Sequence, residues 1–147
     1  MHAIKLISLS FALSLPQLTY AAPHRAVQTE KDLYEECSVY SQAGMRDCLI
    51  KKSAESQAAL KQVEETVDAS LTKWDEDNKY VSLAKARLIA SNKAFPKYRE
   101  AQCEFSASLS GGGAGNAHEM GRLACITELN SRRAEQLRNA VANLPLK

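Results

Sequence analysis

The feature that most restricts the fold of this 147-residue chain is the helical spacing of apolar residues over three long segments. In each segment, mostly apolar side chains recur at helical spacing, with the small Ser53 and Ser56 filling the first two turns of the first segment, which places them along one face of an α-helix. No segment alternates apolar and polar residues as a half-buried strand does. The three faces consist of Leu49, Leu60, Val63, Val67, Leu71 and Trp74; of Val81, Ala84, Leu88, Phe95, Tyr98, Gln102 and Phe105; and of Leu123, Ile126, Asn130, Ala134, Leu137, Val141 and Leu144.

These faces predict an all-α fold, in which three long antiparallel helices follow a short N-terminal helix near residues 31–39. Two residues interrupt the pattern. Pro96 lies inside the second segment and predicts a kink rather than a break, because the apolar face continues on both sides of it. Asn130 lies on the third face, so it is either a buried polar group with a partner or a sign that the assigned face is displaced by one residue.

The first residues have the parts of a cleavable secretory signal peptide. Lys5 precedes an apolar run over residues 6–15, Pro16 interrupts the run, and a cleavage site follows at Ala21. The run is about half of the ~20 residues that a transmembrane helix needs, and no later segment is long and apolar enough, so we expect no membrane span. The expected organisation is a signal peptide over 1–21, a flexible leader over 22–31 and a helical domain over 32–144, in a protein that is periplasmic or otherwise secreted.

The four cysteines predict two disulfides, because an even number in a small exported domain is typical of a disulfide framework. A zinc site would need closely spaced ligand pairs, which this chain lacks. Cys103 and Cys125 lie at nearly equal distances from the centre of a glycine tract, so two antiparallel helices leaving that tract would bring them to one height. Cys37 and Cys48 flank Gly44 in the same way. Of the three possible connectivities we therefore expect Cys37–Cys48 and Cys103–Cys125.

The glycine tract, with Gly111, Gly112, Gly113 and Gly115, matches neither a dinucleotide fingerprint nor a phosphate-binding loop. The serines before it and His118 after it do not form a nucleophile, base and orienting group, so we expect no enzyme activity and no cofactor. Without Lys5 the chain has 18 basic and 17 acidic residues, and this balance does not favour nucleic acid. A connection running from Ser106 to about Ala117 is longer than a turn needs and is either a contact site or a mobile insertion.

Two stretches resemble the LprI-like lysozyme inhibitor domain family. AFPKYREAQCEF, a glycine-rich loop and LACITELNSRRAEQL resemble its C-terminal part, and CSVYSQAGMRDCL resembles its N-terminal pair of cysteines. The resemblance extends over about residues 35–140. It implies a helical, exported, cysteine-containing domain whose partner is a protein, either a lysozyme or a muramidase toxin.

The first functional hypothesis is an inhibitor that occludes a muramidase cleft with the glycine-rich loop. The alternative is a structural or adaptor protein of the bacterial envelope that inhibits nothing. The sequence predicts no oligomeric state. The residues expected to contact the partner are Ser108, Ser110, Asn116, His118 and Arg122.

Export can be tested by mass spectrometry of the protein recovered from the periplasm. The measured mass should correspond to a chain that starts at Ala22, because cleavage is expected after Ala21. A full-length chain that accumulates in the cytosol would contradict the assignment of the signal peptide.

Overall fold

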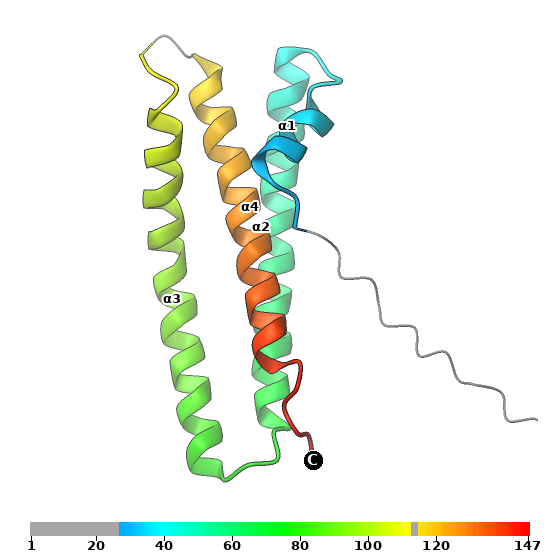
Figure 1. The fold of residues 1–147 in the computed structure, drawn as a ribbon, viewed down its shortest axis with the longest axis vertical. Helices are drawn as coiled ribbons and strands as arrows, with labels where there is room; N and C mark the ends of the chain where they lie inside the picture. Colours follow the sequence, from blue (N-terminus) through cyan, green and yellow to red (C-terminus); the bar gives the residue numbers. More distant parts are fainter. Residues whose placement is uncertain (1–26, 113–114) are drawn as a thin grey trace, which may run out of the picture.

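The computed structural model describes residues 27–112 and 115–147, which form four helices (Figure 1). The three long helices run antiparallel to one another in sequence order, and the short helix crosses two of them near one end of the bundle. The predicted all-α fold is confirmed. The helices are α1 (Glu30–Cys37), α2 (Gln42–Thr72), α3 (Asn78–Ser108) and α4 (Asn116–Val141).

The N-terminal boundary of the fold lies earlier than the sequence predicts. The side-chain oxygen of Thr29 accepts a hydrogen bond from the backbone N–H of Asp32. The carboxylate of Asp32 in turn accepts one from the backbone N–H of Thr29, which completes a capping box. The backbone N–H of Glu30 donates to Glu128 on α4 at 2.6 Å. Residues 29–31 therefore belong to the folded domain rather than to the expected leader, while the expected signal peptide lies outside the described residues.

The core between α2 and α4 matches the faces predicted for those helices. Leu60, Val63 and Val67 are buried on α2, and they pack in one cluster with Ala134 and Leu137 of α4. Burial of these side chains on facing stripes supplies the main apolar contact of the bundle.

At the far end of the core, Trp74 is half-buried and pairs with Leu146 in an isolated antiparallel bridge. The backbone N–H of Asp75 donates to the carbonyl of Pro145 at 2.8 Å. The last residues of the chain therefore close the end of the bundle that carries the α2–α3 connection.

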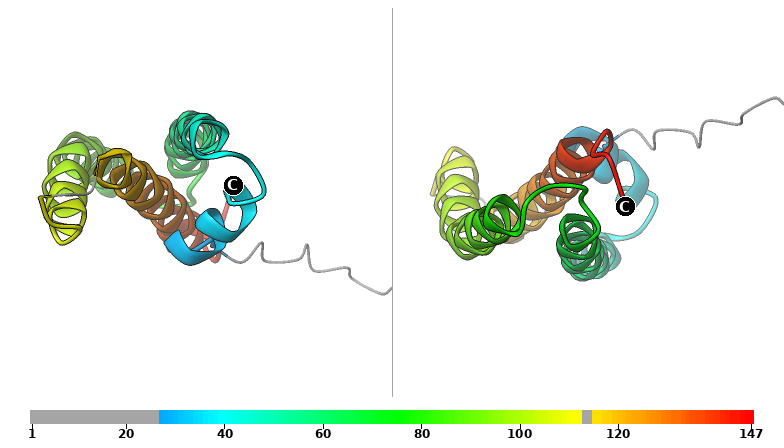
Figure 2. Two further views of the ribbon diagram at one scale, coloured as in Figure 1. Left: turned by 90° about the horizontal axis from the view of Figure 1, so that it is seen from above. Right: turned by 90° about the horizontal axis from the view of Figure 1, so that it is seen from below.

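The face predicted for α3 is wrong in its second half. Tyr98 and Phe105 are 57% and 61% exposed, whereas Cys103 and Ala107 are buried. α3 lies at the edge of the bundle with α4 as its main neighbour, so only a narrow stripe of it is covered (Figure 2). The helix is continuous through Pro96, in agreement with the prediction that this residue does not break it.

Both predicted disulfides are confirmed. Cys37 and Cys48 join α1 to α2 with a Cα–Cα distance of 5.7 Å, and Cys103 and Cys125 join α3 to α4 at 5.5 Å. Each pair lies in the half of the bundle where α2 begins, α3 ends and α4 begins. Covalent links therefore hold the end of the molecule that carries the glycine-rich connection.

The core assignment can be tested with Val67→Asp. Val67 is 3% exposed, so the variant places an unpaired charge among apolar side chains and should lower the free energy of unfolding by at least ~3 kcal/mol. The exposed Ala59 lies two turns away on the same helix, and Ala59→Asp should cost less than ~1 kcal/mol. Urea unfolding of both variants provides the measurement, and equal losses would contradict the assigned face.

Candidate functional site

The glycine-rich connection spans a step between the ends of α3 and α4. α3 ends five residues after Cys103, while α4 begins nine residues before Cys125. Because the disulfide holds these cysteines at one height and a helix rises 1.5 Å per residue, α4 extends about 6 Å beyond the end of α3. Residues 109–112 continue beyond the end of α3 to about the height at which α4 begins (Figure 1). The first turn of α4 therefore stands free of α3.

Two glycines give the connection its shape. Gly111 has φ of 73° and Gly115 has φ of 49°, in the region that residues with a Cβ atom rarely adopt. A Cβ atom at either position would meet no atom within 4 Å, so neither glycine is required by close packing within the chain. The connection covers residues 109–115, which is within the usual length for helix pairs and shorter than the predicted Ser106–Ala117 loop.

Four of the five residues predicted to contact a partner lie at or next to this step. Ser110 and Asn116 are exposed, and His118 is half-buried in the first turn of α4. Ser108 is the last residue of α3, and its hydroxyl donates to the carbonyl of Phe105 at 2.7 Å. The end of the bundle also exposes an apolar side chain that the prediction omitted, Leu109, which is 73% exposed.

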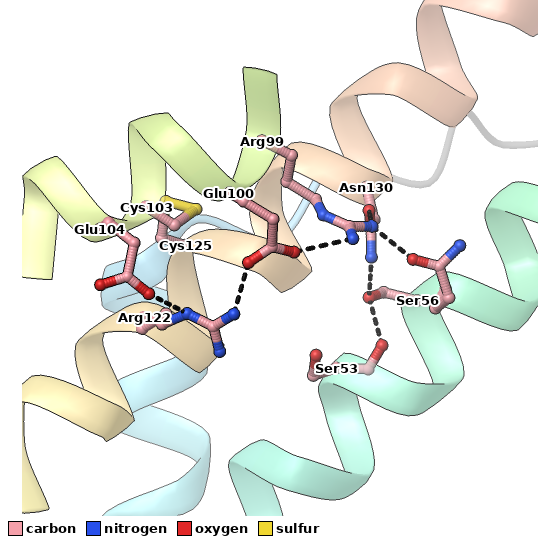
Figure 3. Close-up of polar contacts among 10 residues, drawn as sticks. Ser53, Ser56, Arg99, Glu100, Cys103, Glu104, Arg122, Cys125 and Asn130 are labelled. Carbon is pink, nitrogen blue, oxygen red and sulfur yellow. Dashed lines mark hydrogen bonds and ion pairs between the residues drawn. A yellow bond between two sulfur atoms is a disulfide. The ribbon is translucent and has the colours of Figure 1, made fainter. Parts of the chain in front are cut away.

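The fifth residue, Arg122, is directed toward α3 rather than toward the free end (Figure 3). Its Nε lies 2.5 Å from Glu104, and its Nη2 donates to Glu100. Burial disfavours the charged form of Glu100, but hydrogen bonds and charges from Arg99 and Arg122 outweigh this effect and hold the pKa of Glu100 below its ordinary value. Arg122 thus links α4 to α3 just below the step.

A second ion pair fixes the first turn of α4 to α2. Arg46 donates to both carboxylate oxygens of Glu119, at 2.6 Å and 2.8 Å. The hydrogen bonds from Arg46 hold the pKa of the Glu119 carboxyl below its ordinary value. A bidentate pair of this kind restricts orientation as well as distance. The free end of α4 is therefore held on its α2 side although α3 does not reach it.

A buried polar cluster centred on Asn130 lies about two turns beyond Arg122 along α4 (Figure 3). Asn130 is fully buried, accepts from Arg99 of α3 at 2.8 Å and donates to Ser56 of α2 at 3.0 Å. Arg99 also donates to Gln57 and to Glu100. Of the two interpretations of Asn130, the buried polar group with partners is confirmed.

The sequence interpretation missed Arg99, although Cys103 indicates its position. The disulfide requires Cys103 to face α4, and the residue one turn earlier on the same face is Arg99. The predicted face ran instead through Tyr98 and Gln102, one position away.

The carboxylates near the step are paired with guanidinium groups. In residues 27–112 and 115–147, no group of three His, Cys, Asp or Glu side chains is placed to hold a metal ion. None of the helices in that part of the chain is long and apolar enough to cross a membrane.

Comparison with known proteins gives one family match. A family model described as lysozyme inhibitor LprI matches residues 35–137, a range that includes all four cysteines. No curated protein and no solved structure matches the chain. The match therefore covers α2 and α3 completely and most of α4.

The polar cluster predicts that Asn130→Ala is costly. The change removes the acceptor of Arg99 and the donor to Ser56 inside the bundle, so the free energy of unfolding should fall by about 2–3 kcal/mol. Asn139→Ala is a matched control on an exposed turn of the same helix and should change stability by less than ~0.5 kcal/mol. Urea unfolding compares the two variants, and similar small effects would show that the cluster does not support the bundle.

Proposed function

Because the chain belongs to the LprI family of lysozyme inhibitors, we propose that it inhibits a lysozyme or a related muramidase by placing its glycine-rich end in the enzyme's cleft. In this proposal the protein acts after export, in the periplasm or outside the cell, and catalyses no reaction itself. The observation that carries the proposal is the step between α3 and α4, which leaves the first turn of α4 uncovered on its α3 side while Arg46 holds Glu119 of that turn against α2.

The chemistry of a muramidase cleft fits the groups at this end. Such a cleft contains a pair of carboxyl groups that act on the glycosidic bond. Residues 106–118 contain no carboxylate, and the hydroxyl of Ser110 and the amide of Asn116 are exposed donors. Gly115 supplies no side-chain cap to α4, so backbone N–H groups at its N-terminus are available to an anion. All of these groups suit cleft carboxylates.

Apolar contact would accompany these hydrogen bonds. Leu109 is 73% exposed at the edge of the connection, where it can fill a sugar-binding subsite as the connection enters the cleft. Because a Cβ atom built at Gly111 or Gly112 would meet no atom of the chain within 4 Å, the backbone there is uncovered and can approach the enzyme surface closely.

The contacts that hold the start of α4 in place support the same proposal. The Cys103–Cys125 disulfide holds α4 against α3, and the Arg46–Glu119 ion pair holds the first turn of α4 against α2. An element that is already ordered loses less conformational entropy on binding, so more of its contact energy contributes to affinity.

A charge reversal at the exposed turn tests the proposal. Asn116→Glu places a carboxylate at the first position of α4, where it favours the helix but repels cleft carboxylates. Inhibition of a sensitive muramidase should weaken by at least about a hundredfold, since like charges at an interface cost several kcal/mol. The measurement is the inhibition constant in a cell-wall lysis assay with animal and bacterial muramidases.

Asn78→Glu is the matched control. Asn78 is the exposed first residue of α3, also without a side-chain cap, at the opposite end of the bundle. This variant should inhibit as the unaltered protein does. Equal inhibition by both variants would contradict contact through the glycine-rich end. If the unaltered protein slows no muramidase at micromolar concentration, the inhibitor proposal is wrong and the alternative of an envelope adaptor takes its place.

A further inference from the structure

α3 carries a second apolar face that the bundle does not cover. Ala94, Tyr98, Ala101 and Phe105 follow one another at spacings of four, three and four residues, and all four are exposed. We call these four residues the outer seam. Tyr98 and Phe105 remain 57% and 61% exposed, so two large apolar rings lie uncovered on one face of α3. A 3–4 spacing of this kind is typical of the seam of a coiled coil.

The seam lies on a helix that has free space beside it. α3 is at the edge of the bundle, and α4 separates it from α1 (Figure 2). The covered stripe of α3 contains Cys103 and Ala107, and the outer seam is displaced from it around the helix. A further helix can therefore pack on α3 without displacing α2 or α4.

We propose that the outer seam binds the outer seam of a second copy of this chain, with the two α3 helices antiparallel about a two-fold axis. In this arrangement Phe105 faces Ala94 of the second copy, and Tyr98 faces Ala101 of the second copy. Each large side chain thus meets a small one, which allows knobs-into-holes packing. Because the axis is two-fold, every such contact occurs twice.

Charge complementarity supports the same direction. Lys97 and Glu104 flank the seam on one side at equivalent positions of successive seven-residue repeats, and both are exposed. In an antiparallel pair, flanking positions of this type face each other, so Lys97 of each copy meets Glu104 of the other. Glu104 also contacts Arg122, but its side chain remains 55% exposed and can accept a second partner.

A parallel pair would lose these contacts. It would place Tyr98 against Tyr98 and Ala101 against Ala101, so bulky layers would alternate with empty ones. It would also bring Lys97 beside Gln102 and Glu104 beside Leu109, with no ion pair on either flank. The sequence of the seam is therefore complementary to itself only in the antiparallel direction.

The dimer leaves the glycine-rich ends accessible. Leu109 of one copy comes level with residue 90 of the other, so the two ends point in opposite directions. The seam covers about three turns, so the interface buries roughly 1,000 Å², near the lower limit for a specific contact. We therefore expect association in the micromolar range.

Sedimentation equilibrium of the purified protein at micromolar concentrations should give a mass approaching twice that of the monomer. Ala101→Arg fills the space opposite Tyr98 and should raise the dissociation constant at least about tenfold, because an overfilled contact excludes the partner. Ala58→Arg is the matched control, since Ala58 is exposed in the middle of α2. A monomer throughout the concentration range, or equal association of the two variants, would overturn the proposal.

A mixing experiment tests the pairing of charges. Lys97→Glu and Glu104→Lys should each be monomeric alone, because each homodimer would contain two like-charged pairs. Mixed in equal amounts, the two variants should form a heterodimer, since every carboxylate on the flank of one variant then faces an ammonium group of the other. Circular dichroism of each variant checks that the helices are intact. A mixture that stays monomeric while the unaltered protein dimerises would overturn the antiparallel arrangement.

Discussion

Asn130 connects the three long helices through one buried amide. It belongs to α4, accepts a hydrogen bond from Arg99 of α3 and donates one to Ser56 of α2. A buried amide without partners costs free energy, so any sliding of one helix along another is penalised when these bonds separate. Apolar stripes alone would allow one helix to take several positions along another at similar energy. The hydrogen bonds of the Asn130 amide favour one of these positions.

The geometry of the free end follows from that selection. With α3 and α4 fixed in height by Asn130 and by the Cys103–Cys125 disulfide, the different lengths of helix beyond these contacts produce the step. The same contacts also fix the rotation of α3 about its axis, because Arg99 and Cys103 must face α4. The turn of α4 that α3 does not reach and the outward direction of the aromatic side chains of the outer seam are therefore two results of the same contacts.

The sequence allowed prediction of the helices, the disulfides and the faces of α2 and α4, because these depend on local spacing. On α3, apolar residues lie on two faces. Periodicity therefore predicts burial of Tyr98 and Phe105, whereas the covered face runs through Arg99 and Cys103. The identification of Cys103 as a bridging residue contained enough information to correct this choice. The length of the connection was overestimated because Ser108 and Asn116 are compatible with both helix and loop.

The partners of the polar groups were beyond sequence reasoning. The link between Arg46 and Glu119 spans 73 positions, and that between Asn130 and Ser56 spans 74. Such contacts depend on the rotation of each helix about its own axis, to within a fraction of a turn. Helical periodicity indicates only which broad face is apolar.

Both disulfides join cysteines that are consecutive along the chain. With the proposed export of the chain, N-terminus first, Cys37 and Cys48 would emerge from the membrane before Cys103. Cys37 and Cys48 can be oxidised when no other cysteine is available. Cys103 and Cys125 then have only each other to pair with. The native connectivity can therefore form in order of emergence, without the slow thiol–disulfide exchange that nonconsecutive pairings require.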